Sequence, residues 1–185
     1  LSHPPATFRQ EADKIDRRLP AARKFVVDNK LNETLGPTGG DLGIIVQGGL
    51  FNVLSGRMAL ADLADGYGNV DLPTHVLNVT HPLVPEEIAR FCAGKRAVLV
   101  VEEGSPDFIE QAIGQILRKA DLNTVLHGKD VLPNAGEYTP LVVAKGLSAF
   151  LKRYGRPVPS LDGWLGEVEA HGAVGAECVA RSHCF

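Results

Sequence analysis

Apolar positions from residue 41 onward alternate between short continuous runs and helical spacings. Strands are predicted at residues 42–46, 74–79, 96–102 and 123–126. The first is a short apolar run, and the third contains five apolar residues in succession, Ala97–Val101, as in a strand buried on both faces. Between and after them, apolar residues recur every three or four positions and predict helices over residues 50–64, 85–92, 106–120 and 140–151. Strands that alternate with helices imply right-handed crossovers between parallel strands. We therefore expect an α/β fold, a three-layer α/β/α domain with a mostly parallel sheet.

The two ends of the chain follow other patterns. Residues 8–30 combine clustered charges with helical apolar spacing and predict one or two short helices, the second starting at Pro20. After Tyr154 the apolar periodicity fades, and we expect a linker there. The predicted organisation is thus an N-terminal arm (1–40), an α/β domain (41–153) and a C-terminal linker (154–185). Since the chain begins with Leu1 and not with Met, we expect a piece of a longer protein.

Composition agrees with a globular domain and excludes several classes of function. The 185 residues carry 19 Lys and Arg against 22 Asp and Glu, a net charge of −3, so the basic surface of a nucleic-acid-binding protein is not expected. No apolar run approaches the roughly 18 residues that cross a bilayer, so a membrane is not an expected partner either. Three cysteines are too few for a disulfide scaffold and favour a reducing, cytoplasmic setting.

A glycine turn follows the first predicted strand. Gln47, Gly48 and Gly49 lie where ligands often approach an α/β sheet. The third glycine of a dinucleotide-binding fingerprint is missing, because position 52 is Asn. A tight turn explains the two glycines without a ligand. A stand-alone nucleotide- or coenzyme-A-binding module therefore stays an alternative function.

Three titratable residues follow the second and third predicted strands at the same edge of the sheet. Glu102 and Glu103 are neighbours on a strand, so their side chains point to opposite faces and cannot act together. Glutamates that cap the following helix, or that are simply solvated, are the simpler interpretation, and a contact of one of them with a neighbouring domain or ligand is the other. His81 has no Asp or Glu close in sequence to pair with it. The sequence therefore predicts no catalytic residues.

Histidines and cysteines gather near the C-terminus. The four residues have spacings that match no standard zinc site: His171, Cys178, His183 and Cys184. We therefore predict no metal ligands, and a metal-binding tail stays a weaker alternative.

Several segments, in order along residues 18–151, resemble the thiamine-diphosphate-dependent indolepyruvate ferredoxin oxidoreductases. The most similar is Val98-Leu99-Val100-Val101-Glu102-Glu103, and the others lie at 18–26, 29–32, 42–49, 81–85, 128–133 and 136–140. His81 stands where that family has Tyr, and Val84 is an extra residue. Cys184-Phe185 resembles the start of the family's Phe-Cys-x-Gly-Cys-Pro run. The resemblance implies a domain like the C-terminal domain of transketolase.

The resemblance also implies what the parent protein does. Such enzymes decarboxylate aryl pyruvates such as indolepyruvate to acyl-coenzyme A and pass the electrons to ferredoxin. They use thiamine diphosphate, Mg²⁺ and iron–sulfur clusters, with coenzyme A as co-substrate. The family's Gly-Asp-Gly…Asn and Cys-x-x-Cys signatures are absent from this sequence, so we expect the chain to bind none of these cofactors and to be inactive alone.

The expected role of the chain is therefore structural. Its expected partners are the pyrimidine- and pyrophosphate-binding domains of a parent enzyme that is a homodimer. The candidates for contacts at the sheet edge or between domains are Gln47, Gly48, Gly49, His81, Glu102 and Glu103.

Overall fold

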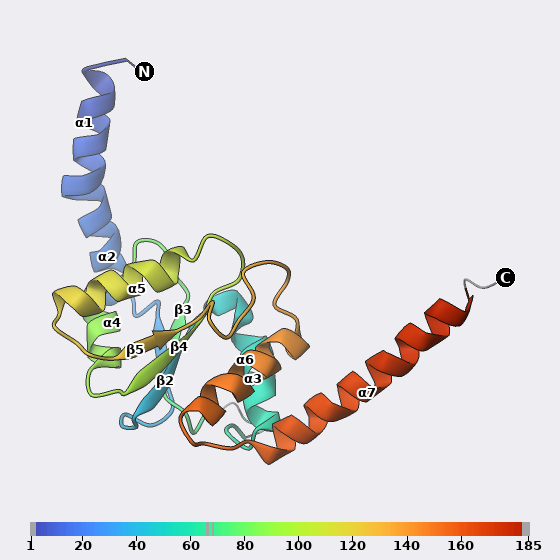
Figure 1. The fold of residues 1–185 in the computed structure, drawn as a ribbon. Coiled ribbons are helices and arrows are strands. Elements are labelled where there is room, and N and C mark those ends of the chain that lie inside the picture. The colour runs from blue at the N-terminus through green and yellow to red at the C-terminus, as the bar shows by residue number, and fades with distance from the viewer. Residues whose placement is uncertain (1–2, 66, 68, 183–185) are drawn as a thin grey trace.

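A five-stranded sheet lies at the centre of the computed structural model, which describes residues 3–65, 67 and 69–182, with side chains up to residue 172 (Figure 1). The strands are β1 (Glu33–Leu35), β2 (Leu42–Gln47), β3 (Thr74–Leu77), β4 (Ala97–Val101) and β5 (Val125–His127). Their order is β1-β3-β2-β4-β5. The strands β2 to β5 are parallel, and β1 pairs antiparallel with β3 at one edge. The predicted mostly parallel sheet is confirmed.

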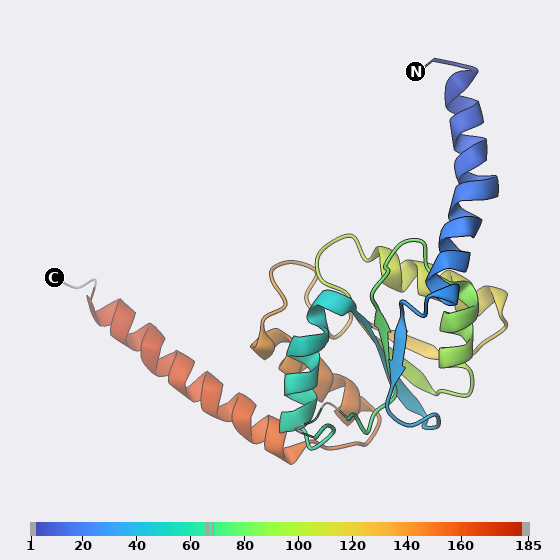
Figure 2. The same cartoon turned by 180° about the vertical axis from the view of Figure 1, so that it is seen from behind.

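Helices cover both faces of this sheet, as Figures 1 and 2 show. One face carries α4 (Pro85–Cys92) and α5 (Phe108–Lys119), and the other carries α3 (Phe51–Leu60) and α6 (Pro140–Arg153). A 3₁₀ turn (Gly48–Leu50) precedes α3. The predicted three-layer α/β/α class is therefore confirmed.

Two apolar cores follow from the alternation of side chains along each strand. Ile44 packs with Leu54 of α3 and Leu147 of α6, all fully buried. Its neighbour Ile45 belongs to the second core, with Ile113 of α5. Because β2 and β4 are buried on both faces, their apolar residues run on without a polar interruption.

The N-terminal segment projects from the domain as helices. It comprises α1 (Ala6–Asp13), a π-helical turn (Lys14–Arg18) and α2 (Leu19–Asp28), with Pro20 in the first turn of α2 as predicted. Three residues of the predicted arm nevertheless join the sheet as β1. The sequence gives little sign of this strand, because it is short, carries no buried residue and forms only by pairing with β3, about forty residues away in the chain.

The C-terminal segment differs more from the expectation. Residues predicted as a linker form α7 (Pro159–Ser182), which extends away from the domain (Figure 2). Its first turns are held by Leu161, which is fully buried, and by Trp164, which stacks on the Arg57 guanidinium at 4.7 Å. Among the described residues, no helix is both long and apolar enough to span a bilayer.

Candidate functional site

The carboxyl ends of β2 and β4 meet at the point where the chain reverses its direction of travel across the sheet. From β2 the chain crosses to β3 on one side and then returns to β4 on the other. Ligands of open α/β sheets bind at such a switch point. Here the backbone N–H of Glu103 donates to Oε1 of Gln47 at 2.9 Å. Both residues line a cavity of about 430 Å³, which we call the switch cavity.

The glycine turn shapes one wall of the switch cavity. A Cβ at Gly48 would lie 2.5 Å from Oδ1 of Asn78, so only glycine leaves room for this amide at the end of β3. The Asn78 amide donates to the Leu31 carbonyl at 2.8 Å and to Glu33 at 3.0 Å. The close approach therefore ties the turn to the edge strand β1, which is a structural role.

The charge of the switch cavity is unfavourable for a phosphate. Its lining consists of Gln47, Gly48, Gly49, Leu50, Leu77, Asn78, Thr80 and Glu103. Among these described residues the one charged side chain is a carboxylate, and neither Lys nor Arg is present. A nucleotide or coenzyme A would bring phosphates towards Glu103 without a cation to balance them. This arrangement disfavours the nucleotide-binding alternative.

Glu102 serves as the cap of α5. The residue is 5% exposed, and its carboxylate accepts the backbone N–H of Ile109 at 2.9 and 3.1 Å and that of Glu110 at 3.0 Å. These N–H groups belong to the first turn of the helix and have no partner within it. The predicted capping role is thus confirmed. The Glu103 carboxylate does not contact the first turn of α5, and it accepts the backbone N–H of Tyr138 at 2.5 Å instead.

Lys129 joins the loops that follow β4 and β5. Its ammonium donates to the Glu102 carbonyl at 2.5 Å and to the Tyr138 hydroxyl at 2.8 Å. Burial, together with the carboxylates of Glu102, Glu103 and Glu110, raises the pKa of Tyr138 to about 12. The protonated hydroxyl donates in turn to the Pro133 carbonyl at 2.8 Å.

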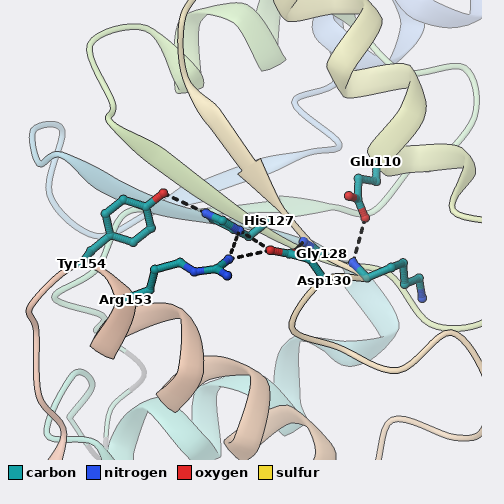
Figure 3. A network of polar contacts seen from close by, with 7 residues as sticks. Glu110, His127, Gly128, Asp130, Arg153 and Tyr154 are labelled. Atoms are coloured by element: carbon teal, nitrogen blue, oxygen red, sulfur yellow. Dashed lines mark hydrogen bonds and ion pairs between the residues drawn. The ribbon is translucent and has the colours of Figure 1, made fainter.

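A second polar network links β5 to α6 (Figure 3). His127 is buried, and its Nδ1 lies 2.6 Å from Asp130 while its Nε2 lies 2.8 Å from the Tyr154 hydroxyl. Arg153 donates to the same Asp130 oxygen at 2.7 Å, and the Gly128 N–H donates to the other at 3.0 Å. Burial raises the pKa of Asp130, but the bonds from His127, Gly128 and Arg153 outweigh it and hold that pKa below its usual value. Both nitrogens of His127 are therefore engaged in contacts that join β5 to the end of α6.

His81 lies apart from the switch cavity. It is exposed and lines another cavity of about 430 Å³, beside Arg23 and Glu86. The structure thus brings together Gln47, Gly48, Gly49 and Glu103, places Glu102 beneath α5, and leaves His81 in a separate depression.

The candidate metal tail falls mostly outside the described side chains. Cys178, His183 and Cys184 lie there, and His171 contacts the Glu167 carbonyl at 2.8 Å through Nδ1. Among the described residues, no three His, Cys, Asp or Glu side chains gather as metal ligands. Cys92 is fully buried in the core, and this burial raises the pKa of its thiol to about 12.

Sequence reasoning missed the roles of Lys129, Tyr138 and the His127 network. In the sequence, segments 128–133 and 136–140 gave no signal other than their resemblance to the family. Their side chains meet β4, α5 and α6 through contacts between residues far apart in the chain.

The fold and the carboxyl edge of the sheet together define the class of protein. The chain is a three-layer α/β domain, and the polar groups at the carboxyl ends of its strands are largely hydrogen-bonded to one another. No protein-family profile matches the chain. It is 29% identical over 147 residues to the indolepyruvate oxidoreductase subunit IorA of Methanothermobacter thermautotrophicus, and equally to IorA of Methanothermobacter marburgensis. These matches cover 78% of this chain and 22% of each relative. Over these residues the chain is similar to the indolepyruvate oxidoreductase subunits, as its short segments predicted, and it spans about a fifth of the length of these relatives.

Among solved structures, the chain is similar to a split-gene transketolase described as an inactive β4 tetramer. The two share 17% sequence identity at a TM-score of 0.43, over 74% of this chain and 41% of the other.

Proposed function

We propose that this chain is a non-catalytic structural domain of a thiamine-diphosphate-dependent 2-oxoacid:ferredoxin oxidoreductase. The observation that carries the proposal is its relation to IorA, a protein named as an indolepyruvate oxidoreductase subunit. The proposed domain corresponds to the C-terminal domain of transketolase. The parent would be cytoplasmic and homodimeric.

The chemistry of the proposed parent lies outside this chain. The parent would decarboxylate an aryl pyruvate such as indolepyruvate oxidatively, transfer the acyl group to coenzyme A and pass electrons to ferredoxin. Thiamine diphosphate, Mg²⁺ and iron–sulfur clusters would supply that chemistry. The described residues offer no metal-ligand set and no cation at the switch cavity, so they do not fit these groups. We therefore assign the cofactors to other domains of the parent.

The polar contacts at the sheet edge support a structural role. Lys129 holds the loops after β4 and β5 together, and Glu102 fixes the start of α5. Such cross-links give the carboxyl edge a defined shape that another domain could dock against. We propose that Gln47, Gly48, Gly49 and Glu103 contact a pyrimidine- or pyrophosphate-binding domain of the parent through the switch cavity, and that His81 contacts it from its own depression.

The proposal is tested by comparing the 185-residue chain with the full-length product of its gene. Both are supplied anaerobically with thiamine diphosphate, Mg²⁺, coenzyme A, indolepyruvate and a low-potential electron-accepting dye. We expect substrate-dependent dye reduction from the full-length protein and none from the 185-residue chain. Turnover by the chain alone would overturn the non-catalytic role. A full-length protein without 2-oxoacid oxidation would overturn the parent activity.

The nucleotide-binding alternative makes a separate prediction. A specific ligand at one hundred times its Kd should stabilise the folded chain by about 2.7 kcal/mol. We expect no shift in the melting temperature with coenzyme A, NAD or ATP. A shift that a Glu103→Lys variant strengthens would instead favour a phosphate-binding switch cavity.

A further inference from the structure

A larger cavity lies away from the switch cavity, on the face of the sheet that carries α4. Its volume is about 610 Å³, which is within the range of small-molecule sites. The walls come from α2, β1, β3 and α4, and include Val27, Thr34, His75, Arg90, Phe91 and Lys95. We call it the α4 cavity.

His75 brings an unpartnered polar atom to the α4 cavity. The residue is 3% exposed, and its Nδ1 lies 2.8 Å from the hydroxyl of Thr34, its partner in the β1–β3 pairing. Its Nε2 is fully buried and has no hydrogen-bond partner among the described residues. Buried polar groups are normally satisfied, so an orphaned imidazole nitrogen beside a cavity points to a ligand.

Lys95 brings a cation to the same cavity. Most of its side chain is covered, since the residue is 9% exposed, and its ammonium lies 4.8 Å from the centre of the Phe91 ring. Among the described residues this ammonium has no acidic partner within ion-pair distance. Gly43 makes room for it, because a Cβ there would lie 2.9 Å from Cδ and Cε of Lys95. A glycine within the buried strand β2 thus lets the lysine stem lie against the sheet.

The remaining lining fixes the kind of ligand. Exposed Lys30 and Arg90 add positive charge, and the one acidic residue of the described lining, Glu87, accepts the Asn32 amide at 2.9 Å. Apolar surface comes from Val27, Pro37, Pro73 and Phe91. The last turn of α4, whose carbonyl end carries partial negative charge, also lines the cavity and opposes a doubly charged phosphate more strongly than a singly charged carboxylate.

From these contacts we infer that the α4 cavity binds a small monocarboxylate with an apolar, aryl-sized body. The carboxylate accepts from the Lys95 ammonium and from the N–H of His75 Nε2, and the apolar body packs on Phe91. This inference rests on the cavity alone and is independent of the parent enzyme's activity.

Phenylacetate is the probe, titrated into the 185-residue chain by calorimetry and followed by NMR of the His75 ring. We expect saturable one-to-one binding that shifts the His75 ring signals. Phenylacetamide, which has the same shape without the charge, should bind at least about tenfold more weakly, and inorganic phosphate should leave the ring signals unchanged. Hydrogen bonds to charged groups justify a loss of this size.

Matched variants test the two groups. Lys95→Met should weaken phenylacetate binding at least about tenfold, whereas Lys119→Met, at an exposed position outside the α4 cavity, should change it less than about threefold. His75→Gln should also weaken binding, which keeps the test decisive if one variant does not fold. Unchanged binding by both folded variants, equal binding of phenylacetamide, or no saturable binding would overturn the inference. Tight binding of inorganic phosphate with the same His75 shift would overturn the carboxylate assignment.

Discussion

The carboxylate of Glu102 accepts the backbone N–H of Ile109 at 2.9 Å, so the residue that follows β4 closes the first turn of α5. This bond explains why a glutamate at the carboxyl edge of the sheet is buried. It also separates the two adjacent glutamates by role, because Glu102 turns under the helix while Glu103 lines the switch cavity.

Replacing Glu102 by Ala removes this cap. We expect the domain to stay folded and to lose about 1–2 kcal/mol of its free energy of unfolding, measured by urea denaturation. Glu137→Ala is the control, since Glu137 is exposed and its side chain has no partner among the described residues. The control should change stability by less than about 0.5 kcal/mol. Equal losses in the two variants would contradict the capping role.

An aspartate in the central sheet should prevent folding. Val100 is 2% exposed in β4, and an unpaired carboxylate there has no partner to offset its burial. We expect Val100→Asp to abolish the cooperative unfolding transition in circular dichroism. Val125→Asp carries the same change on β5, where the side chain is 47% exposed, and should stay folded. A cooperative transition for Val100→Asp would contradict the strand assignment.

Two glycine substitutions should act in opposite directions. A Cβ at Gly128 would overlap the Glu110 carboxylate, which accepts the Lys129 N–H. Gly128→Ala should therefore push that carboxylate aside, break its hydrogen bond to the Lys129 N–H and lower the free energy of unfolding by about 0.5–1.5 kcal/mol. A Cβ at Gly163 in α7 meets no atom within 4 Å, so Gly163→Ala should stabilise the chain by about 0.5–1 kcal/mol. Thermal melts of the pair test this contrast, and the same sign for both would refute it.

Asp130 should contribute stability that depends on pH. Its pKa is lowered in the folded state, whereas the unfolded chain has an ordinary aspartate pKa of about 3.9. The stabilisation is therefore present at neutral pH and is lost as pH falls below about 4. Because the side chain is 44% exposed, solvent screening limits the effect to about 1 kcal/mol.

Urea denaturation from pH 7 to pH 2.5 measures this dependence. Asp130→Asn should be less stable than the original chain at pH 7, and the difference should narrow below pH 4. Asp71→Asn is the control, because it changes an exposed aspartate whose carboxylate has no partner among the described residues. Its free energy of unfolding should stay within about 0.5 kcal/mol of that of the original chain at every pH. If the difference in free energy of unfolding between Asp130→Asn and the original chain did not change with pH, the ion pairs of Asp130 would not contribute to stability.

The sequence predicts best those elements that carry their own periodic signal. The helix predicted over residues 85–92 agrees with α4, and the five-residue apolar run agrees with β4. The strand β1 escapes prediction because its stability comes from pairing with β3, which local pattern does not encode. The network of His127, Asp130 and Arg153 escapes for the same reason, since Arg153 lies 23 residues from Asp130 in the chain. The capping role of Glu102 was predictable because the helix it caps begins only a few residues later.

Sequencing the gene across both ends of this chain shows directly whether the chain is a domain of a larger oxidoreductase. We predict that the reading frame continues past Phe185 into a Cys-x-Gly-Cys-Pro run and a Gly-Asp-Gly segment that belongs to a pyrophosphate-binding domain. A stop codon directly after Phe185, together with a start codon directly before Leu1, would contradict this prediction, because no parent enzyme would then contain this domain.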